Sequence, residues 1–284
     1  MGSMDRTWQL FSESYAVLSK DVEILLFPLM SGISVVLLAV SFFVPLYRTG
    51  VFETLRLGRG GWQEYAALFA WYYANFFIGI FFNGALVACA NIRLSGGNPT
   101  VRDGLRIAFA RVGRIALWAL ITATVGLFLN SMRERGGWLL RLLGASLELA
   151  WTLITYMIVP VILFEDRGVY DSIYRSQELF RKHWGEQVAG SFGFGLLNLL
   201  LCLPAIAMAA FLWKYDPVLG IIMGVCYILI LAIVSSAVKG VFTVALYRYA
   251  TLGEAPPGFS SDVIDEALGG RRPGDWSNGY WSGY

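Results

Sequence analysis

The sequence predicts an all-α, polytopic membrane protein with six transmembrane helices, arranged as three hairpins that are each preceded by an amphipathic interfacial helix. Three observations lead to this fold class. The chain of 284 residues is 57% hydrophobic and only 15% charged, whereas soluble domains are about 25% charged. It contains six long apolar segments. A short amphipathic segment precedes each pair of them.

The six apolar segments are long enough to cross a membrane, because a helix rises about 1.5 Å per residue and about 20 residues cross the hydrocarbon core. They cover residues 24–46, 65–92, 115–132, 143–164, 188–213 and 218–247. The stretch before the fourth segment has two interpretations. It is either a turn outside the membrane or an interfacial helix that begins at Trp138 and precedes the span.

The amphipathic segment recurs three times, with an apolar stripe at helical spacing and charged residues on the other faces. The stripes are Trp8, Phe11, Tyr15, Leu18 and Val22, then Leu105, Phe109, Val112 and Ala116, and then Tyr170, Tyr174, Gln177, Phe180 and Trp184. Thr100 before Asp103 has the pattern of a helix N-cap. We therefore predict a single six-span membrane domain over residues 1–268, with a threefold internal repeat near 5–92, 100–164 and 169–250. The Gly-, Ser- and aromatic-rich tail, 269–284, is expected to be disordered.

The amphipathic segments have two interpretations. Aromatic rings beside arginines suit the headgroup boundary of a membrane, where the rings are buried and the cations meet anionic lipid. Alternatively, the three helices pack against one another as a cytoplasmic collar. In the first case membrane lipids, anionic ones in particular, are the partners. The candidate headgroup-binding residues are then Arg6, Arg102, Arg106, Arg175 and Lys182.

The distribution of basic residues predicts the orientation in the membrane. With the N-terminus in the cytoplasm, fourteen lysines and arginines lie inside and seven lie outside. Because cytoplasmic loops carry an excess of these residues, we expect a multi-pass protein of the cell (inner) membrane with both termini cytoplasmic.

Three stretches carry a resemblance to a known family. They are "RTWQLFSESYAVLSKDVEILLFPLMSGI", "FFNGALVACANIRLSGGNPTVRDGLRIAFARVGRI", and the part that begins "HWGEQ" and ends "ALYRYATLGE". The chain resembles, from Arg6 to Glu254, a bacterial and archaeal family of six-span membrane proteins of uncharacterised function. It is more distantly similar to the membrane domain that accompanies some glycerophosphodiester phosphodiesterases. The resemblance implies a fold and a membrane location but no activity, since none of the matching motifs is catalytic.

Lys239 and Asn83 are the polar residues that lie deepest if the charges after the spans mark the inner membrane boundary. Lys239 is nine residues before Arg248 and Asn83 is ten residues before Arg93, so both lie about 13–15 Å inside that boundary at about 1.5 Å per residue. Two interpretations of Lys239 are open. Its side chain either extends to the cytoplasmic edge or to Glu165 and Asp166, or it faces a cavity beside Asn83.

Three further polar residues lie in the apolar segments, namely Asn75, Glu148 and Asn198. Asn75 shares one face of the second span with Gly79 and Asn83, which suits either close helix packing or a polar pathway. Glu148 lies near the outer boundary, where it is either solvated or a ligand of a transported species. Asn198 lies in the glycine-rich fifth span.

The sequence offers little for other chemistries. A net charge of +2 without a basic block does not suggest nucleic-acid binding. One histidine, His183, and three scattered cysteines do not form a metal site, no cofactor is implied, and no catalytic motif is present. The first hypothesis is therefore a non-enzymatic channel or transporter for a small solute or ion, for which a homo-oligomer could share the pathway. The alternative is a lipid-binding membrane scaffold or assembly factor.

Overall fold

The computed structural model describes residues 3–48, 51, 61–135, 137–183, 193–212, 215–253 and 255–259. Every regular element within these ranges is a helix, which confirms the all-α class. The elements are α1 (Ser3–Leu18), η1 (Val22–Leu25), α2 (Leu26–Arg48), α4 (Trp62–Leu94), α5 (Val101–Ala110), α6 (Val112–Arg135), α7 (Trp138–Ile154), α8 (Ile158–Phe164), α9 (Val169–His183), α10 (Gly193–Leu212) and α11 (Pro217–Leu252). The tail over 269–284 lies outside the described residues.

Within the described residues, five helical segments are long and apolar enough to cross a membrane. They are Val22–Arg48, Trp62–Leu94, Val112–Glu134, Trp138–Phe164 and Pro217–Leu252. The remaining predicted span, 188–213, corresponds to α10, of which the apolar part Leu199–Leu212 is shorter than a full span. The first residues of that span lie outside the described ranges. The arrangement of six spans in three hairpins therefore stays a prediction.

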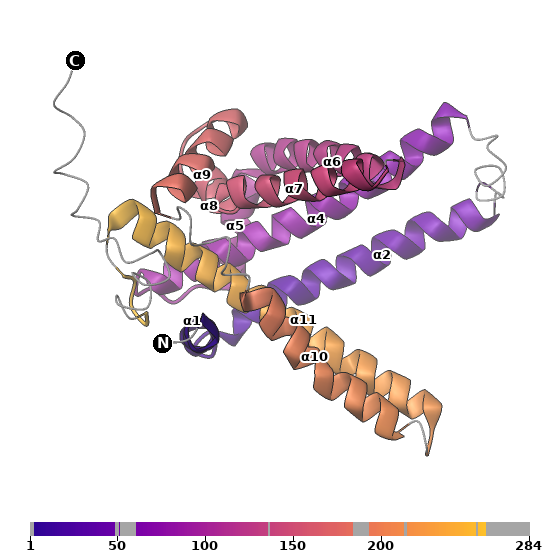
Figure 1. Cartoon of the computed structure of the whole chain (residues 1–284). Helices are drawn as coiled ribbons and strands as arrows, with labels where there is room; N and C mark the ends of the chain where they lie inside the picture. The colour runs from indigo at the N-terminus through magenta and orange to yellow at the C-terminus, as the bar shows by residue number, and fades with distance from the viewer. Residues whose placement is uncertain are drawn as a thin grey trace. The chain divides into compact units, whose positions relative to one another are not determined.

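The helices group into two compact units (Figure 1). The first unit consists of Met1–Leu25, Cys89–Pro99 and Gln177–Tyr284, and the second of Leu26–Ala88 and Thr100–Ser176. In the first unit α10 and α11 run side by side, and α1 packs against both (Figure 1). Small residues let the two long helices approach closely, since Gly220 and Gly224 of α11 and Ala205 of α10 are buried. The Tyr227 hydroxyl donates a hydrogen bond to the Leu201 carbonyl at 3.1 Å.

In the second unit, α6 lies beside α7 and also contacts α4 (Figure 1). The buried Trp118 ring of α6 stacks on Trp151 of α7 at a centroid distance of 5.7 Å. The Tyr73 hydroxyl of α4 donates to the Ala116 carbonyl of α6 at 3.3 Å. These contacts form the packed centre of the unit.

The fourth predicted span consists of two helices, because α7 ends at Ile154 and α8 begins at Ile158. Pro160 explains the break: it has no N–H to donate to the Tyr156 carbonyl, and its ring would clash with that carbonyl in a continuous helix. Trp138 begins α7 itself, so the residues from Trp138 onward are the first turns of the span and not a separate interfacial helix.

The three amphipathic segments form helices α1, α5 and α9, and their small or aliphatic residues face the protein. The buried residues are Ser14, Val17 and Leu18 in α1, Gly104 and Ala108 in α5, and Val169, Ser172, Ser176 and Leu179 in α9. The aromatic residues Trp8, Tyr15, Phe109, Tyr170 and Tyr174 are exposed. Apart from Leu18, the described residues of the apolar stripes are exposed or half-buried, so the stripes are not the most buried faces of these helices.

The start of α5 confirms the N-cap expected at Thr100. The Asp103 N–H donates to the Thr100 hydroxyl oxygen at 3.3 Å, and the Thr100 N–H donates to the Asp103 carboxylate at 3.2 Å. This reciprocal arrangement is a capping box, which satisfies two backbone donors that the first turn of a helix leaves unpaired.

Candidate functional site

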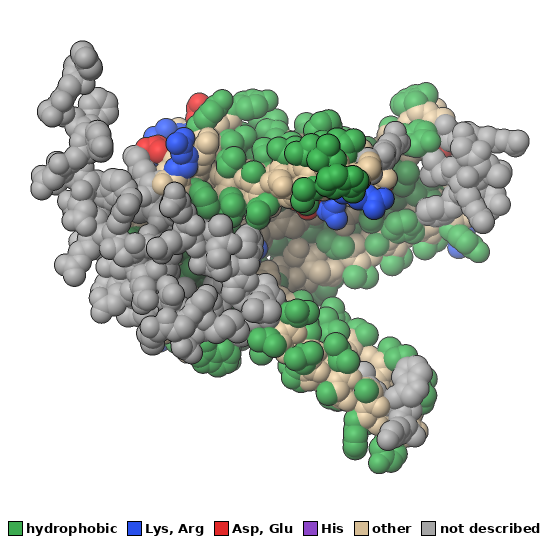
Figure 2. Space-filling view, viewed as in Figure 1, with side chains coloured by type: hydrophobic (Ala, Val, Ile, Leu, Met, Phe, Trp, Pro, Cys, Tyr) green, Lys and Arg blue, Asp and Glu red, His purple; other side chains and the backbone are tan. Residues whose placement is uncertain are grey.

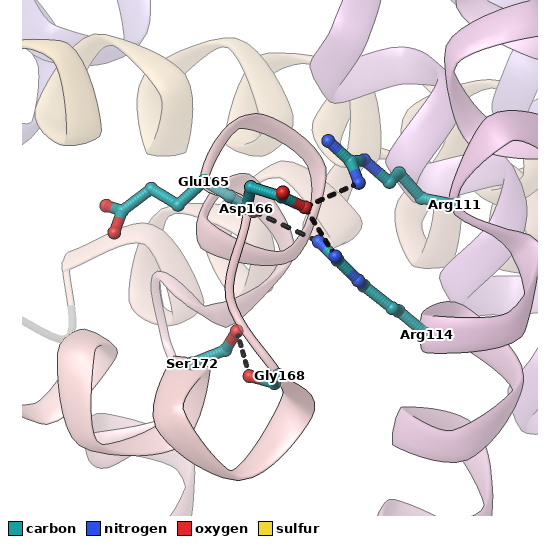
Figure 3. Close-up of polar contacts among 6 residues, drawn as sticks. All are labelled: Arg111, Arg114, Glu165, Asp166, Gly168 and Ser172. Atoms are coloured by element: carbon teal, nitrogen blue, oxygen red, sulfur yellow. Dashed lines mark hydrogen bonds and ion pairs between the residues drawn. The ribbon is translucent and has the colours of Figure 1, made fainter.

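The segment between α8 and α9 brings arginines and carboxylates together in the second unit. Asp166 accepts from Arg114 at 2.5 Å and from Arg111 at 3.1 Å (Figure 3). Arg111 lies between α5 and α6, and Arg114 lies in the first turn of α6. Arg114 also donates to the Glu165 backbone carbonyl at 3.2 Å. These contacts connect the start of α6 to the end of α8.

The neighbouring Glu165 side chain points away from Asp166 (Figure 3) and has its own arginine partners. Its carboxylate lies 2.8 Å from Arg167 and 3.4 Å from Arg175. We call the six residues Arg111, Arg114, Glu165, Asp166, Arg167 and Arg175 the Asp166 cluster. Four arginines face two carboxylates, so the cluster has an excess of positive charge that suits an anionic ligand.

Two carboxyl groups outside the spans have lowered pKa values. Hydrogen bonds from Arg114 and Arg111, together with their positive charges, lower the pKa of Asp166 below its usual value. Hydrogen bonds from the side chain and backbone of Thr100 lower the pKa of Asp103, and Arg106 and Arg102 contribute less. Both groups are therefore ionised at neutral pH.

Replacing Asp166 with asparagine should lower the Tm of the protein at neutral pH and have less effect in acid. Because folding lowers the pKa of Asp166, its stabilising contribution is fully present above the unfolded pKa of about 3.9. That contribution is lost as the pH falls through the lower folded pKa. The measurement is the Tm difference between wild type and Asp166→Asn in detergent, followed from pH 7 into acid. The difference should stay level down to about pH 4 and then shrink, and a difference that grows in acid would contradict this assignment.

A second polar cluster lies in the first unit, at the ends of α4 and α11. Arg93 Nε lies 2.8 Å from Asp21 Oδ2, and the Arg93 guanidinium donates to the Gly97 carbonyl at 3.3 Å. Arg248 of α11 donates to Asn91 Oδ1 at 3.1 Å and to Ser95 Oγ at 2.6 Å. Arg93 and Arg248, which each follow an apolar span, are thus bonded within the protein.

Two of the predicted pathway residues have partners close by. Asn75 donates to the Trp71 carbonyl one turn earlier in α4, at 2.7 Å. Glu148 lies 2.8 Å from Arg133 in an exposed pair between α7 and α6. The Arg133 stem passes over Gly144, where a Cβ atom would lie 3.0 Å from Arg133 Cγ. Glu148 therefore has a solvated partner near the start of the fourth span.

Two other pathway candidates, Asn83 and Lys239, have no side-chain partner among the described residues. Asn83 and Lys239 both have exposed side chains. Neither side chain has a hydrogen bond or ion pair with any part of the chain that the structure describes. Glu165 and Asp166, the carboxylates considered for Lys239, pair with arginines of the second unit. The Asn198 side chain lies outside the described residues.

The headgroup candidates divide into two groups. Arg102 and Arg106 are exposed, and the Arg106 side chain is 76% exposed although it lies 3.4 Å from Asp103. Arg175 is partly buried against Glu165. The side chains of Arg6 and Lys182 lie outside the described residues.

Sequence reasoning did not foresee the pairing of Asp166 with Arg111 and Arg114. From the sequence, Arg111 and Arg114 only surround the apolar stripe of the second amphipathic segment and count among the basic residues expected inside. Sequence reasoning also missed Ser176, whose hydroxyl donates to the Ile154 carbonyl at 2.7 Å and accepts from the Met157 N–H at 3.2 Å. Pro160 in the fourth apolar segment was the sequence signal for the helix break. Ser176 bonds to the backbone groups that this break leaves unpaired. Among the described residues, no three His, Cys, Asp or Glu groups lie together as metal ligands.

Taken together, the apolar helices and the paired charges at their ends define a multi-pass membrane protein. The chain belongs to a family of unknown function, DUF6159, whose model matches residues 63–258. This confirms the expected membership of an uncharacterised family, whereas the distant similarity to the phosphodiesterase-associated membrane domain stays a prediction. Neither the curated proteins nor the solved structures contain a significant match to this chain.

Proposed function

We propose that this protein is a non-enzymatic, lipid-binding membrane scaffold whose amphipathic helices bind anionic headgroups of the cytoplasmic leaflet. One observation carries the proposal. In α5, Arg102, Arg106 and Phe109 are exposed and lie on one face, whereas the buried residues Gly104 and Ala108 lie on the opposite face. The protein thus packs the small residues of α5 and leaves an exposed arginine and aromatic face, although the Phe109 ring also touches Phe81 on one side.

The other two amphipathic helices support the same proposal. In α9 the exposed residues Tyr170, Tyr174 and Arg181 share a face, opposite the buried Ser172 and Ser176. In α1 Trp8 and Tyr15 are exposed seven residues apart. Rings at the level of the headgroups and cations beside them are what an interfacial helix needs. The excess positive charge of the Asp166 cluster would add to the attraction for anionic lipid.

Replacing both Arg102 and Arg106 with glutamine should weaken the binding of anionic lipid. Each basic residue near an anionic surface contributes about 1 kcal/mol, so the double variant should bind about 30-fold more weakly. The measurement is native mass spectrometry of the detergent-solubilised protein, titrated with phosphatidylglycerol or with phosphatidylcholine of the same acyl chains. The matched control is Arg141→Gln, an exposed arginine near the start of α7. Equal retention of phosphatidylglycerol by the double variant and the control would overturn the proposal.

A channel or transporter for a small solute or ion is the second candidate function. Lys239 and Asn83 favour it, because both are exposed polar side chains in long apolar helices and have no partner among the described residues. In a homo-oligomer such residues could share a pathway with those of other copies. Reconstituted protein should then conduct ions or take up solutes faster than empty liposomes, and Lys239→Gln should change that rate. Flux equal to that of empty liposomes across a broad panel of solutes would count against transport.

A further inference from the structure

Three long helical segments change from exposed to buried at one point along their length. In α4, from Trp62 to Asn83, only Phe81 is buried, whereas every residue of 84–90 is buried. In α11, only Gly220 and Gly224 are buried before residue 237. From 237 to 247, every residue except Lys239 is buried. The N-terminal part of α11 is therefore mostly exposed and that of α4 is exposed or half-buried, whereas the C-terminal parts are covered.

The segment made of α7 and α8 shows the same change. From Trp138 to Tyr156 only Gly144 is buried, and from 157 to 163 every residue except Val159 is buried. The change coincides with the break between α7 and α8. The outward side chains of the exposed parts are mostly aliphatic, and Figure 2 shows such hydrophobic side chains over the α10–α11 hairpin.

The exposed parts have the length of the hydrocarbon core. Residues 62–83 and 217–236 span about 33 and 30 Å at about 1.5 Å per residue, and the hydrocarbon core is about 30 Å thick. Residues 138–156 are not counted, because the exposed Glu148–Arg133 ion pair lies in the middle of that part. An aromatic residue lies at or just before the start of each counted part. These residues are Trp62 and Tyr215, which are both 77% exposed. Such aromatic residues are typical of the membrane–water interface.

Two amphipathic helices contact their neighbours at the point of change. The Phe109 ring of α5 lies 4.7 Å from the Phe81 ring, two residues before Asn83. Ser176 of α9 bonds to Ile154 and Met157, on either side of Tyr156. This step rests on the proposed function, in which α5 and α9 lie in the plane of the headgroups. The contacts then favour a headgroup level at the change and not at the charges that follow it.

We propose that the hydrocarbon core ends near Asn83 along α4 and near Lys239 along α11, and that the Lys239 ammonium binds the phosphate of a lipid at its level of α11. This site uses a residue of α11 and none of α5. Lys239 fits the role because it is exposed in an otherwise buried stretch and has no partner among the residues that the structure describes. Its side chain is thus left uncovered by the protein.

The pairing of the terminal arginines explains why a depth measured from Arg248 misleads. Arg248 bonds to Asn91 and Ser95, and Arg93 lies against Asp21. The Arg93 charge is thus paired with a carboxylate, whereas Arg248 is held by neutral protein groups. Since both guanidinium groups are fixed by the protein, neither needs a headgroup layer beside it. Lys239 and Arg248 are nine positions apart. This separation is then the length of a protein-covered extension of α11 and not a depth within the hydrocarbon.

Site-directed spin labels in liposomes test the position of the boundary. In a background in which the three native cysteines are replaced by alanine, single labels are placed at residues 83, 230 and 239 of the full chain. The accessibilities to oxygen and to a water-soluble nickel complex report depth. We expect residue 230, where the native Ile230 is exposed, to be accessible mainly to oxygen, and residues 83 and 239 to be accessible to the nickel complex. A label at 239 or at 83 as deep as the label at 230 would overturn the boundary.

The lipid contact has its own test by native mass spectrometry. Lys239→Gln should lower the retention of phosphatidylglycerol about 5-fold, as expected for one cation at the headgroup level, and Arg141→Gln should leave it unchanged. Excess inorganic phosphate should not displace the lipid, and displacement would mean that a free phosphate ion is the ligand. Unchanged retention by Lys239→Gln would refute the Lys239 site while leaving the effect of Arg102 and Arg106 intact, so the two proposals fail independently.

Discussion

Replacing Trp118 with alanine is expected to lower the free energy of unfolding by about 3–5 kcal/mol, as for other buried aromatic residues. The Trp118 side chain of α6 is only 3% exposed and stacks on Trp151 of α7. Its loss removes this contact and leaves a cavity between α6 and α7. In thermal unfolding of the detergent-solubilised protein, the Tm should fall by about 10 °C.

Trp138 provides the matched control for this prediction. It begins α7, and its side chain is 79% exposed, so truncation to alanine creates no cavity in the protein. Trp138→Ala should change the Tm by no more than a few degrees, as surface substitutions usually do. Equal losses of Tm in the two variants would show that Trp118 does not lie in the packed centre of the unit.

Replacing Ser176 with alanine is expected to destabilise the break between α7 and α8 by about 2–4 kcal/mol. The fully buried Ser176 hydroxyl donates to the Ile154 carbonyl and accepts from the Met157 N–H. Alanine would leave both backbone groups without this partner, and each unsatisfied buried group costs about 1–3 kcal/mol. The measurements are the Tm and the hydrogen exchange of the Met157 amide, which should become faster.

Ser172→Ala is the control for this prediction. It removes a buried hydroxyl from the same helix without removing the hydrogen bonds at the break. Ser172 is also fully buried in α9, but its hydroxyl donates only to the Gly168 carbonyl, which already accepts the Ser172 N–H at 2.9 Å. Ser172→Ala therefore leaves no backbone group unpaired and should cost less than about 1 kcal/mol. If Ser172→Ala and Ser176→Ala lower the Tm equally, the break does not depend on Ser176.

Local sequence predicted the helices and several of their ends. Thr100 and Asp103 form the capping box that their spacing indicates, because capping involves residues only three apart. The apolar segments became helices with similar bounds, since helix length and hydropathy are properties of consecutive residues. The fourth segment differs because Pro160 breaks the helix. The Met157 N–H at the break then bonds to Ser176, which lies nineteen residues away in the chain.

The candidate sites were less predictable, because each depends on residues far apart in the chain. Arg111 and Asp166 are 55 residues apart and Arg248 and Asn91 are 157 apart, yet each pair is within hydrogen-bond distance. In the sequence, Arg248 looked like a marker of the membrane edge. In the structure, Arg248 is bonded to protein groups, which moves the proposed boundary to Lys239 and Asn83.

The sequence by itself determined that this protein is helical, that it is apolar enough for a membrane and that three of its helices are amphipathic. These properties follow from the composition and spacing of neighbouring residues. Only the tertiary structure decided which face of α5 and α9 is buried, where the fourth span breaks and which arginines are already paired. The physical reason is that burial and ion pairing depend on groups brought together by folding, and hydropathy along the chain contains no information about those neighbours.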